Sequence, residues 1–194
     1  MQVSQMLSYW GLKVLAILLL LAGRRAGGRD LFQQMLALRP DDRYALASLA
    51  HVQAQLGDKH AAVAALGQLT EAWPQNAAAW FNLGYMLEDM GRRSGAEEAF
   101  RRALAVDPKM DRAWYGLALI LIHDRRFDAA VVALKKNTEL QPMSPYGWYQ
   151  LARVHVDRQE PEEAVKIIRH LRGFEPKVAA QLERETGLKT AQAS

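Results

Sequence analysis

Apolar residues recur along the chain at intervals of three and four, which is the spacing of one face of an α-helix. One such run consists of Trp80, Leu83, Gly84 and Leu87. A second run of the same kind follows after a break near Gly91 and consists of Ala96, Phe100 and Ala103. The pattern predicts two amphipathic helices joined by a short turn.

This pair of runs returns every 34 residues. Five of the seven prolines share that spacing, namely Pro40, Pro74, Pro108, Pro142 and Pro176. In blocks 43–76, 77–110, 111–144 and 145–178 the eighth residue is small: Ala50, Gly84, Ala118 and Ala152. The twenty-fourth residue is bulky: Leu66, Phe100, Leu134 and Ile168. The small residues predict close helix contact, and proline at the block end stops the second helix.

Local signals predict where several helices begin and end. Asp58 and Pro161 suit the first turn of a helix, and Ser94 begins a capping-box sequence that predicts a helix start there. Gly187 suits the end of a C-terminal helix. Asn137 stands where the pattern predicts a core position, so its amide needs a hydrogen-bond partner if it is buried.

A 34-residue helix–turn–helix unit with Trp-x-x-Leu-Gly, then alanine, a bulky residue and proline resembles the tetratricopeptide repeat. The resemblance covers residues 43–178 and implies an all-α fold, a right-handed α-solenoid of helix–turn–helix repeats. The expected layout has an apolar helix with a basic turn, the second helix of a degenerate repeat, four repeats, and a capping helix with a tail. These segments are 1–28, 29–42, 43–76, 77–110, 111–144, 145–178 and 179–194.

The resemblance implies that the first helices line a concave side. Their second, fifth, ninth and twelfth residues are not needed for packing inside a repeat, and many of them are aromatic or basic. We predict that they form a groove for a partner protein, as a peptide or a helix. The residues are Tyr44, Phe81, Tyr85, Arg112, Tyr115, Tyr146, Tyr149 and Arg153. The alternative is that these side chains pack against neighbouring helices.

Composition and charge narrow the function classes. The chain is 50% hydrophobic and contains no cysteine, which excludes disulfides, thiolate metal sites and a cysteine nucleophile. The net charge is +4, of which +3 lies in residues 1–28, and the basic pairs elsewhere alternate with acids. We therefore predict no nucleic-acid partner. The five histidines lack metal-ligand spacing and no phosphate-binding loop appears, so no enzyme activity, metal, cofactor or small-molecule substrate is predicted.

The N-terminal segment has no polar side chain from Val14 to Ala22. It suits a membrane or partner anchor, an extra repeat in phase with the others, or a cleaved signal, for which the cleavage site is poor. The anchor would use Trp10, Leu15, Leu18, Leu19 and Leu21. Lys13 interrupts a span, whereas Arg24 and Arg25 would place the repeats on the cytoplasmic side of an inner membrane. The alternative is a soluble protein in the cytoplasm.

These patterns predict a non-catalytic scaffold or assembly adaptor that binds a protein or peptide and is tethered to a membrane or a membrane complex. The alternative is a structural accessory subunit of a multi-subunit membrane enzyme, which would use its outer surfaces and leave the groove empty.

Overall fold

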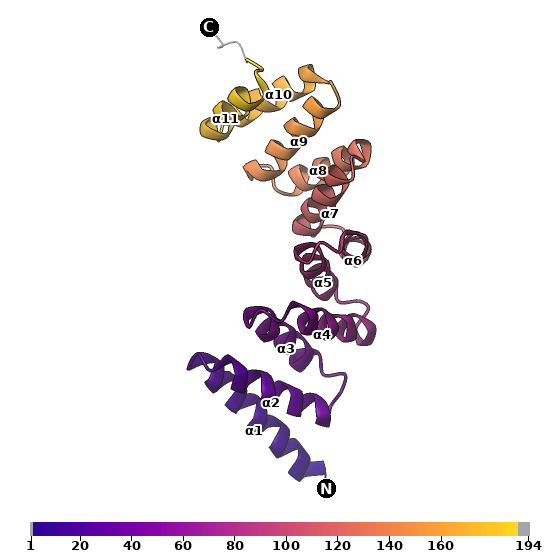
Figure 1. The fold of residues 1–194 in the computed structure, drawn as a ribbon, viewed down its shortest axis with the longest axis vertical. Coiled ribbons are helices and arrows are strands. Elements are labelled where there is room, and N and C mark those ends of the chain that lie inside the picture. The colour runs from indigo at the N-terminus through magenta and orange to yellow at the C-terminus, as the bar shows by residue number, and fades with distance from the viewer. Residues whose placement is uncertain (1, 190–194) are drawn as a thin grey trace. The chain divides into compact units, whose positions relative to one another are not determined.

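The computed structural model describes the backbone of residues 2–189 and the side chains of residues 9–189. These residues form eleven α-helices and no strand (Figure 1). The helices are α1 (Gln2–Leu21), α2 (Arg25–Leu38), α3 (Arg43–Gln55), α4 (Lys59–Ala72), α5 (Ala77–Asp89), α6 (Arg93–Val106), α7 (Asp111–His123), α8 (Phe127–Leu140), α9 (Pro145–Asp157), α10 (Pro161–Arg172) and α11 (Pro176–Thr186).

The chain divides into two compact units, one ending at Val106 and the other beginning at Asp107. In the first unit, α1 packs on α2, α3 on α4 and α5 on α6, and neighbouring pairs also touch (Figure 1). In the second unit, α7 packs on α8 and α9 on α10, and α11 lies against both α9 and α10. The predicted all-α architecture of helix–turn–helix repeats is confirmed.

The helix boundaries follow from capping and from backbone conformation. Asp58 caps α4 as predicted, because its carboxylate accepts a hydrogen bond from the Ala61 amide at 3.0 Å. The turns within the last two pairs place Arg125 and Gln159 in the left-handed region, with φ of 58° and 62°, at the place where earlier pairs have glycine. The helix start predicted at Ser94 comes too late, since α6 begins at Arg93 and Ser94 is already helical.

Close helix contact explains the small residues of the repeat. A Cβ atom at Gly84 would lie 2.8 Å from the ring of Phe100, which is buried in the same pair. The block with glycine at the eighth place therefore carries the largest residue at the twenty-fourth place, and the blocks with alanine carry leucine or isoleucine. The side chains at the eighth and twenty-fourth places together fill a space of nearly constant volume, as expected for a close-packed interior.

Asn137 and Gly147 form a second matched pair. Asn137 is buried, and its amide donates to the carbonyl oxygen of Asp111 at 2.9 Å, which is the partner that its burial demands. A Cβ atom at Gly147 would lie only 2.1 Å from Oδ1 of Asn137. Glycine at this place, where the other repeats have alanine, makes room for the amide.

Tryptophan side chains stabilise the turns between repeats by hydrogen bonds. The indole nitrogens of Trp80, Trp114 and Trp148 each donate to the carbonyl oxygen of the proline six residues earlier, at 2.8–2.9 Å. The first repeat has Leu46 at this place, and there Trp73 at the end of α4 donates instead to the carbonyl of Asp41 at 2.8 Å. Each indole thus donates a hydrogen bond to a turn carbonyl that accepts none within a helix.

Two predicted segment boundaries fall inside helices. The helix expected from residue 29 is α2 and begins at Arg25, because Gly27 and Gly28 are helical and lie against Leu19 and Leu20 of α1. The C-terminal helix expected from residue 179 is α11 and begins at Pro176, since that proline occupies the first helical turn. This helix ends at Gly187, which has a φ of 73°, as predicted.

Candidate protein-binding surfaces

In the first unit, Tyr44 on α3 is partly used for internal contacts. The Lys13 ammonium on α1 lies 4.0 Å from the centre of the Tyr44 ring and 5.1 Å from that of Trp10. The ring of Phe32 meets Tyr44 edge-on, with the ring centres 6.0 Å apart. Cation–π contacts of this kind hold α1 against α3 and leave the ring 38% exposed.

The other two predicted residues of this unit lie on α5 and differ in exposure. Phe81 is half-buried, and its ring centre lies 5.9 Å from that of the buried Phe100. Tyr85 is 58% exposed and contributes to no core cluster. Tyr85 therefore keeps its ring area available to a partner, and Phe81 serves mainly as packing.

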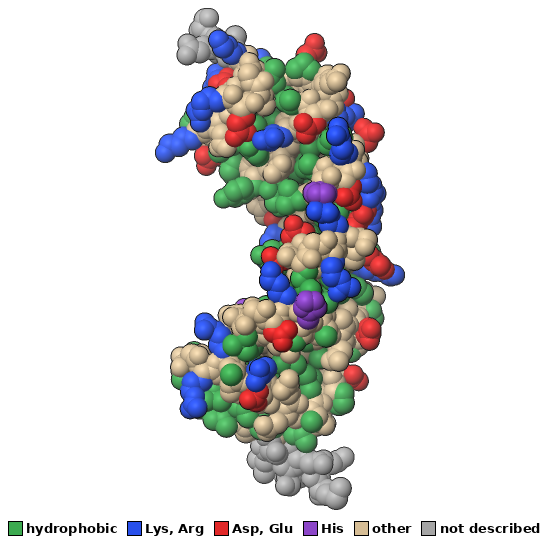
Figure 2. All heavy atoms as spheres, viewed as in Figure 1, with side chains coloured by type: hydrophobic (Ala, Val, Ile, Leu, Met, Phe, Trp, Pro, Cys, Tyr) green, Lys and Arg blue, Asp and Glu red, His purple; other side chains and the backbone are tan. Residues whose placement is uncertain are grey.

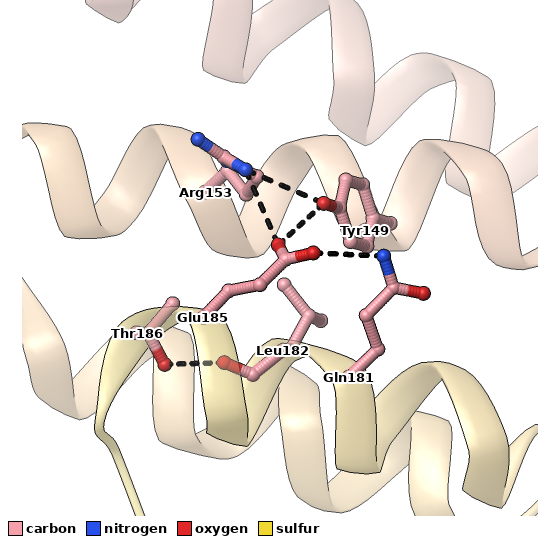
Figure 3. A network of polar contacts seen from close by, with 6 residues as sticks. All are labelled: Tyr149, Arg153, Gln181, Leu182, Glu185 and Thr186. Carbon is pink, nitrogen blue, oxygen red and sulfur yellow. Dashed lines mark hydrogen bonds and ion pairs between the residues drawn. The ribbon is translucent and has the colours of Figure 1, made fainter.

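In the second unit, two predicted residues bind a helix of the same chain. Glu185 on α11 accepts hydrogen bonds from the Tyr149 hydroxyl at 2.6 Å and from Arg153 at 3.2 Å (Figure 3). Gln181 donates to the second carboxylate oxygen at 2.8 Å. The hydrogen bond from Tyr149 is the largest cause that lowers the pKa of the Glu185 carboxyl, and hydrogen bonding to Tyr149 raises the pKa of Arg153. These two residues thus hold α11 by their polar ends.

The remaining predicted residues of the second unit lie on α7 and α9. Tyr146 is 70% exposed at the start of α9, Tyr115 is half-buried on α7, and Arg112 is exposed at the start of α7. Of the eight predicted residues, three lie in the first unit and five in the second. Among the aromatic residues of this set, Tyr85 and Tyr146 are the two with most of their surface exposed.

The outer side of α1 is apolar and exposed. Four of the five predicted anchor residues lie there: Trp10, Leu15, Leu18 and Leu21, the last with 81% of its surface exposed. The exception is Leu19, which turns inward and packs against the core beside Gly27. Val14 and Ile17 are not among the predicted anchor residues, but they are exposed on the same side.

A membrane span is not found in this helix. None of the helices that the structure describes is both long and apolar enough to cross a bilayer. The orientation predicted from Arg24 and Arg25, with the repeats on the cytoplasmic side, assumed a spanning segment and loses that basis.

The opposite side of α1 is bonded to the turn between α2 and α3. Tyr9 is buried, its hydroxyl donates to Asp42 at 2.7 Å, and the guanidinium of Arg39 lies 4.3 Å from the ring centre. Burial and the hydrogen bond to Asp42 raise the pKa of Tyr9 to about 12. The sequence alone offered one signal for this contact, the 33-residue separation that places Tyr9 and Asp42 about one repeat apart.

Another surface that sequence reasoning missed surrounds Trp73. This residue is 44% exposed at the end of α4, and the Arg43 guanidinium lies 5.8 Å from its ring centre. Beside it is a shallow depression of about 340 Å³, lined in part by Pro74 and Asn76. Trp73 matches no repeat position, so periodicity gave no reason to select it.

Charged side chains of both signs are interspersed on the surface (Figure 2). Figure 2 shows Lys and Arg side chains alternating with Asp and Glu on the visible face. Ion pairs such as Lys59–Asp89 and Arg158–Asp128 join acids and bases within each unit. Among the described residues, no group of three or more acids and histidines could hold a metal ion.

Comparison with known proteins identifies the class. Residues 48–92 and 87–136 match the family model of the tetratricopeptide repeat. This region of the chain, residues 48–136, thus consists of tetratricopeptide repeats. Proteins of this class are generally non-catalytic modules that bind other proteins or peptides. The comparison with curated proteins found no match to this chain.

Several solved structures share the fold. MamA from Desulfovibrio magneticus has a TM-score of 0.75 at 20% identity, covering 91% of this chain and 96% of that one. YrrB, described as a tetratricopeptide-repeat protein with an unusual peptide-binding site, has a TM-score of 0.75 at 16% identity, covering 87% and 88%. A tetratricopeptide-repeat protein from Parabacteroides merdae has a TM-score of 0.80 at 17% identity, covering 93% and 74%.

Proposed function

We propose that the protein is a non-catalytic scaffold or assembly adaptor whose first helices bind a peptide or a helix of a partner protein. The observation that carries this proposal is the exposure of Tyr85 and Tyr146 on first helices, where neither ring serves a core. Tyrosine offers a large contact area and a polar end at a small cost in side-chain entropy. YrrB, which shares the fold, is described as having a peptide-binding site.

The test is capture of partners by the purified chain from a cell extract, followed by mass spectrometry. Tyr85→Ala and Tyr146→Ala remove exposed rings and should leave the fold intact. The control is Val132→Ala, because Val132 is 60% exposed but lies on a second helix, α8. We expect the tyrosine variants to lose partners that the control retains. Equal recovery by all three variants and the wild-type chain would contradict the proposal.

The alternative is an accessory subunit that contacts a larger complex through its outer surfaces. The exposed apolar side chains of Val132, on the second helix α8, and of Trp73, directly after the second helix α4, favour it. In that case Val132→Ala loses partners and the tyrosine variants do not. The same capture experiment therefore separates the two functions.

We also propose that α1 attaches the protein to a membrane or to a membrane complex. The observation behind this proposal is the exposed apolar side of α1. Fractionation of cells that express the full chain or a Leu18→Gln/Leu21→Gln variant tests it. We expect the wild-type chain in the membrane fraction and the variant outside it; identical distribution of the two would contradict attachment.

A further inference from the structure

The exposed side of α1 is continuous over three helical turns. The large apolar side chains exposed on it are Trp10, Val14, Leu15, Ile17, Leu18 and Leu21. The small residues Gly11 and Ala22 complete the same side, so no polar side chain interrupts it. A soluble monomer exposes single apolar residues at many places, but a contiguous apolar face of this kind marks an interaction site.

The last helix shows how this chain covers an end with polar residues. The side chains that α11 exposes include Lys177, Gln181, Arg184 and Glu185. Its buried side presents Ala179 and Leu182 to α9 and α10. The first helix buries an apolar side in the same way, against α2, but its other side is apolar as well. The outer side of α1 is therefore suited to a non-aqueous environment.

Charge selects among the possible occupants of this face. Residues 1–28 contain three basic residues and no acid. Arg24 and Arg25 are exposed just after the end of α1, whereas the Lys13 ammonium lies over the Tyr44 ring of α3. A second copy of α1 would bring like charges together, whereas anionic lipid headgroups would attract them. Trp10, at the edge of the face beside Lys13, has the amphipathic ring that is enriched at the boundary between headgroups and acyl chains.

We propose that α1 lies flat on a bilayer surface that contains anionic lipids, with its outer face at the boundary of the acyl chains and without crossing the membrane. This inference rests on the proposed attachment and names its partner as the lipid itself. Because α1 packs on α2 through the opposite side, at Ala16 and Leu20, the first unit keeps its fold when it binds. Interfacial helices of this type combine apolar burial with electrostatic attraction.

The experiment is flotation of the full chain with protein-free vesicles. One set is phosphatidylcholine alone, and the other contains about 30% phosphatidylglycerol. The variant is Leu18→Gln/Leu21→Gln, and the control is Val132→Gln, which makes the same kind of change at an apolar residue about as exposed as Leu18. Circular dichroism verifies that both keep their helix content.

We expect the wild-type chain and the control to bind anionic vesicles about tenfold more strongly than neutral ones, and added salt to reduce that binding. The double variant should lose at least about tenfold in binding to anionic vesicles. Wild-type protein that stays unbound, binds both vesicle types equally, or binds as well after the double substitution would overturn the inference.

Two further outcomes would overturn the lipid assignment and leave the other proposals standing. Binding to native membranes but not to protein-free vesicles would assign the outer face of α1 to a membrane protein. A wild-type dimer in solution that the double substitution converts to a monomer, without vesicle binding, would assign it to a second copy. Partner capture through Tyr85 and Tyr146 is measured without membranes, so it is independent of both outcomes.

Discussion

Gly147→Ala adds a single methyl group at a glycine that is tightly enclosed by α8. The new Cβ atom would lie 2.1 Å from Oδ1 of Asn137, whereas such contacts are essentially never shorter than 3.0 Å. The nearest atom of Thr138 would be 3.1 Å away, so the methyl group has no other space. The Asn137 amide must therefore rotate or α9 must move away from α8.

Both responses lower the free energy of unfolding. Rotation breaks the hydrogen bond from Asn137 to Asp111 and leaves a buried amide without a partner, at about 1–3 kcal/mol. Movement of the helix costs about 1–3 kcal/mol by overpacking. Replacing glycine by alanine in a helix gains at most about 1 kcal/mol. We expect a net destabilisation of about 1–2 kcal/mol.

Urea unfolding followed by circular dichroism measures this change, with Gly67→Ala as the control. Gly67 lies in the middle of α4, and a Cβ atom there meets nothing within 4 Å. The control should therefore raise stability by up to about 1 kcal/mol. The double variant Gly147→Ala/Asn137→Ala removes the colliding amide, so it should be less destabilised than the sum of the single variants. The reasoning is refuted if Gly147→Ala is as stable as the wild-type protein or if the double variant is strictly additive.

Two other predictions concern the first unit. Gly84→Ala should destabilise the protein by about 1–3 kcal/mol, because its Cβ atom would lie 2.8 Å from the Phe100 ring. Adding Phe100→Leu to that variant should recover part of the loss. A denaturant titration that finds no recovery would contradict the idea that residues 84 and 100 fill one common space. Tyr9 has a folded-state pKa of about 12, above its unfolded value of about 10, so its contribution is complete below pH 10 and is lost as the pH rises through 12. Tyr9→Phe should be less stable than the wild-type protein by about 1 kcal/mol at neutral pH, and this difference should shrink above pH 10; a pH-independent difference in urea midpoints would argue against the raised pKa.

The repeat period in the sequence was enough to predict the helices and their order. Proline spacing and the small eighth residues located the second and first helices of each pair, and burial of Asn137 with a partner was expected from its place in the pattern. Helix starts were less certain, since a capping sequence such as the one at Ser94 competes with a neighbouring residue that can also begin the helix.

Contacts between helices were beyond the pattern, because periodicity assigns a side of a helix but not the residue that faces it. Tyr149 was predicted to be open to a partner, yet it binds Glu185 of α11, a helix outside the repeats that supplied the pattern. Tyr44 is covered in part by Lys13, which stood in an apolar segment and was considered only as an obstacle to a membrane span. The roles of Tyr85 and Tyr146 on the binding surface remain predictions.

The tryptophan–proline hydrogen bonds have a consequence for how such a chain can lengthen. At Trp80, Trp114 and Trp148 both partners lie within seven consecutive residues, so each turn between repeats is specified by the segment that forms it. A tandem duplication of residues 74–107 would copy this hydrogen bond together with the helices. The turn at Asp41 depends instead on Trp73, 32 residues later, so a deletion within α4 would affect a turn that lies before α3. Gene duplication is therefore better tolerated in the later repeats than in the first one.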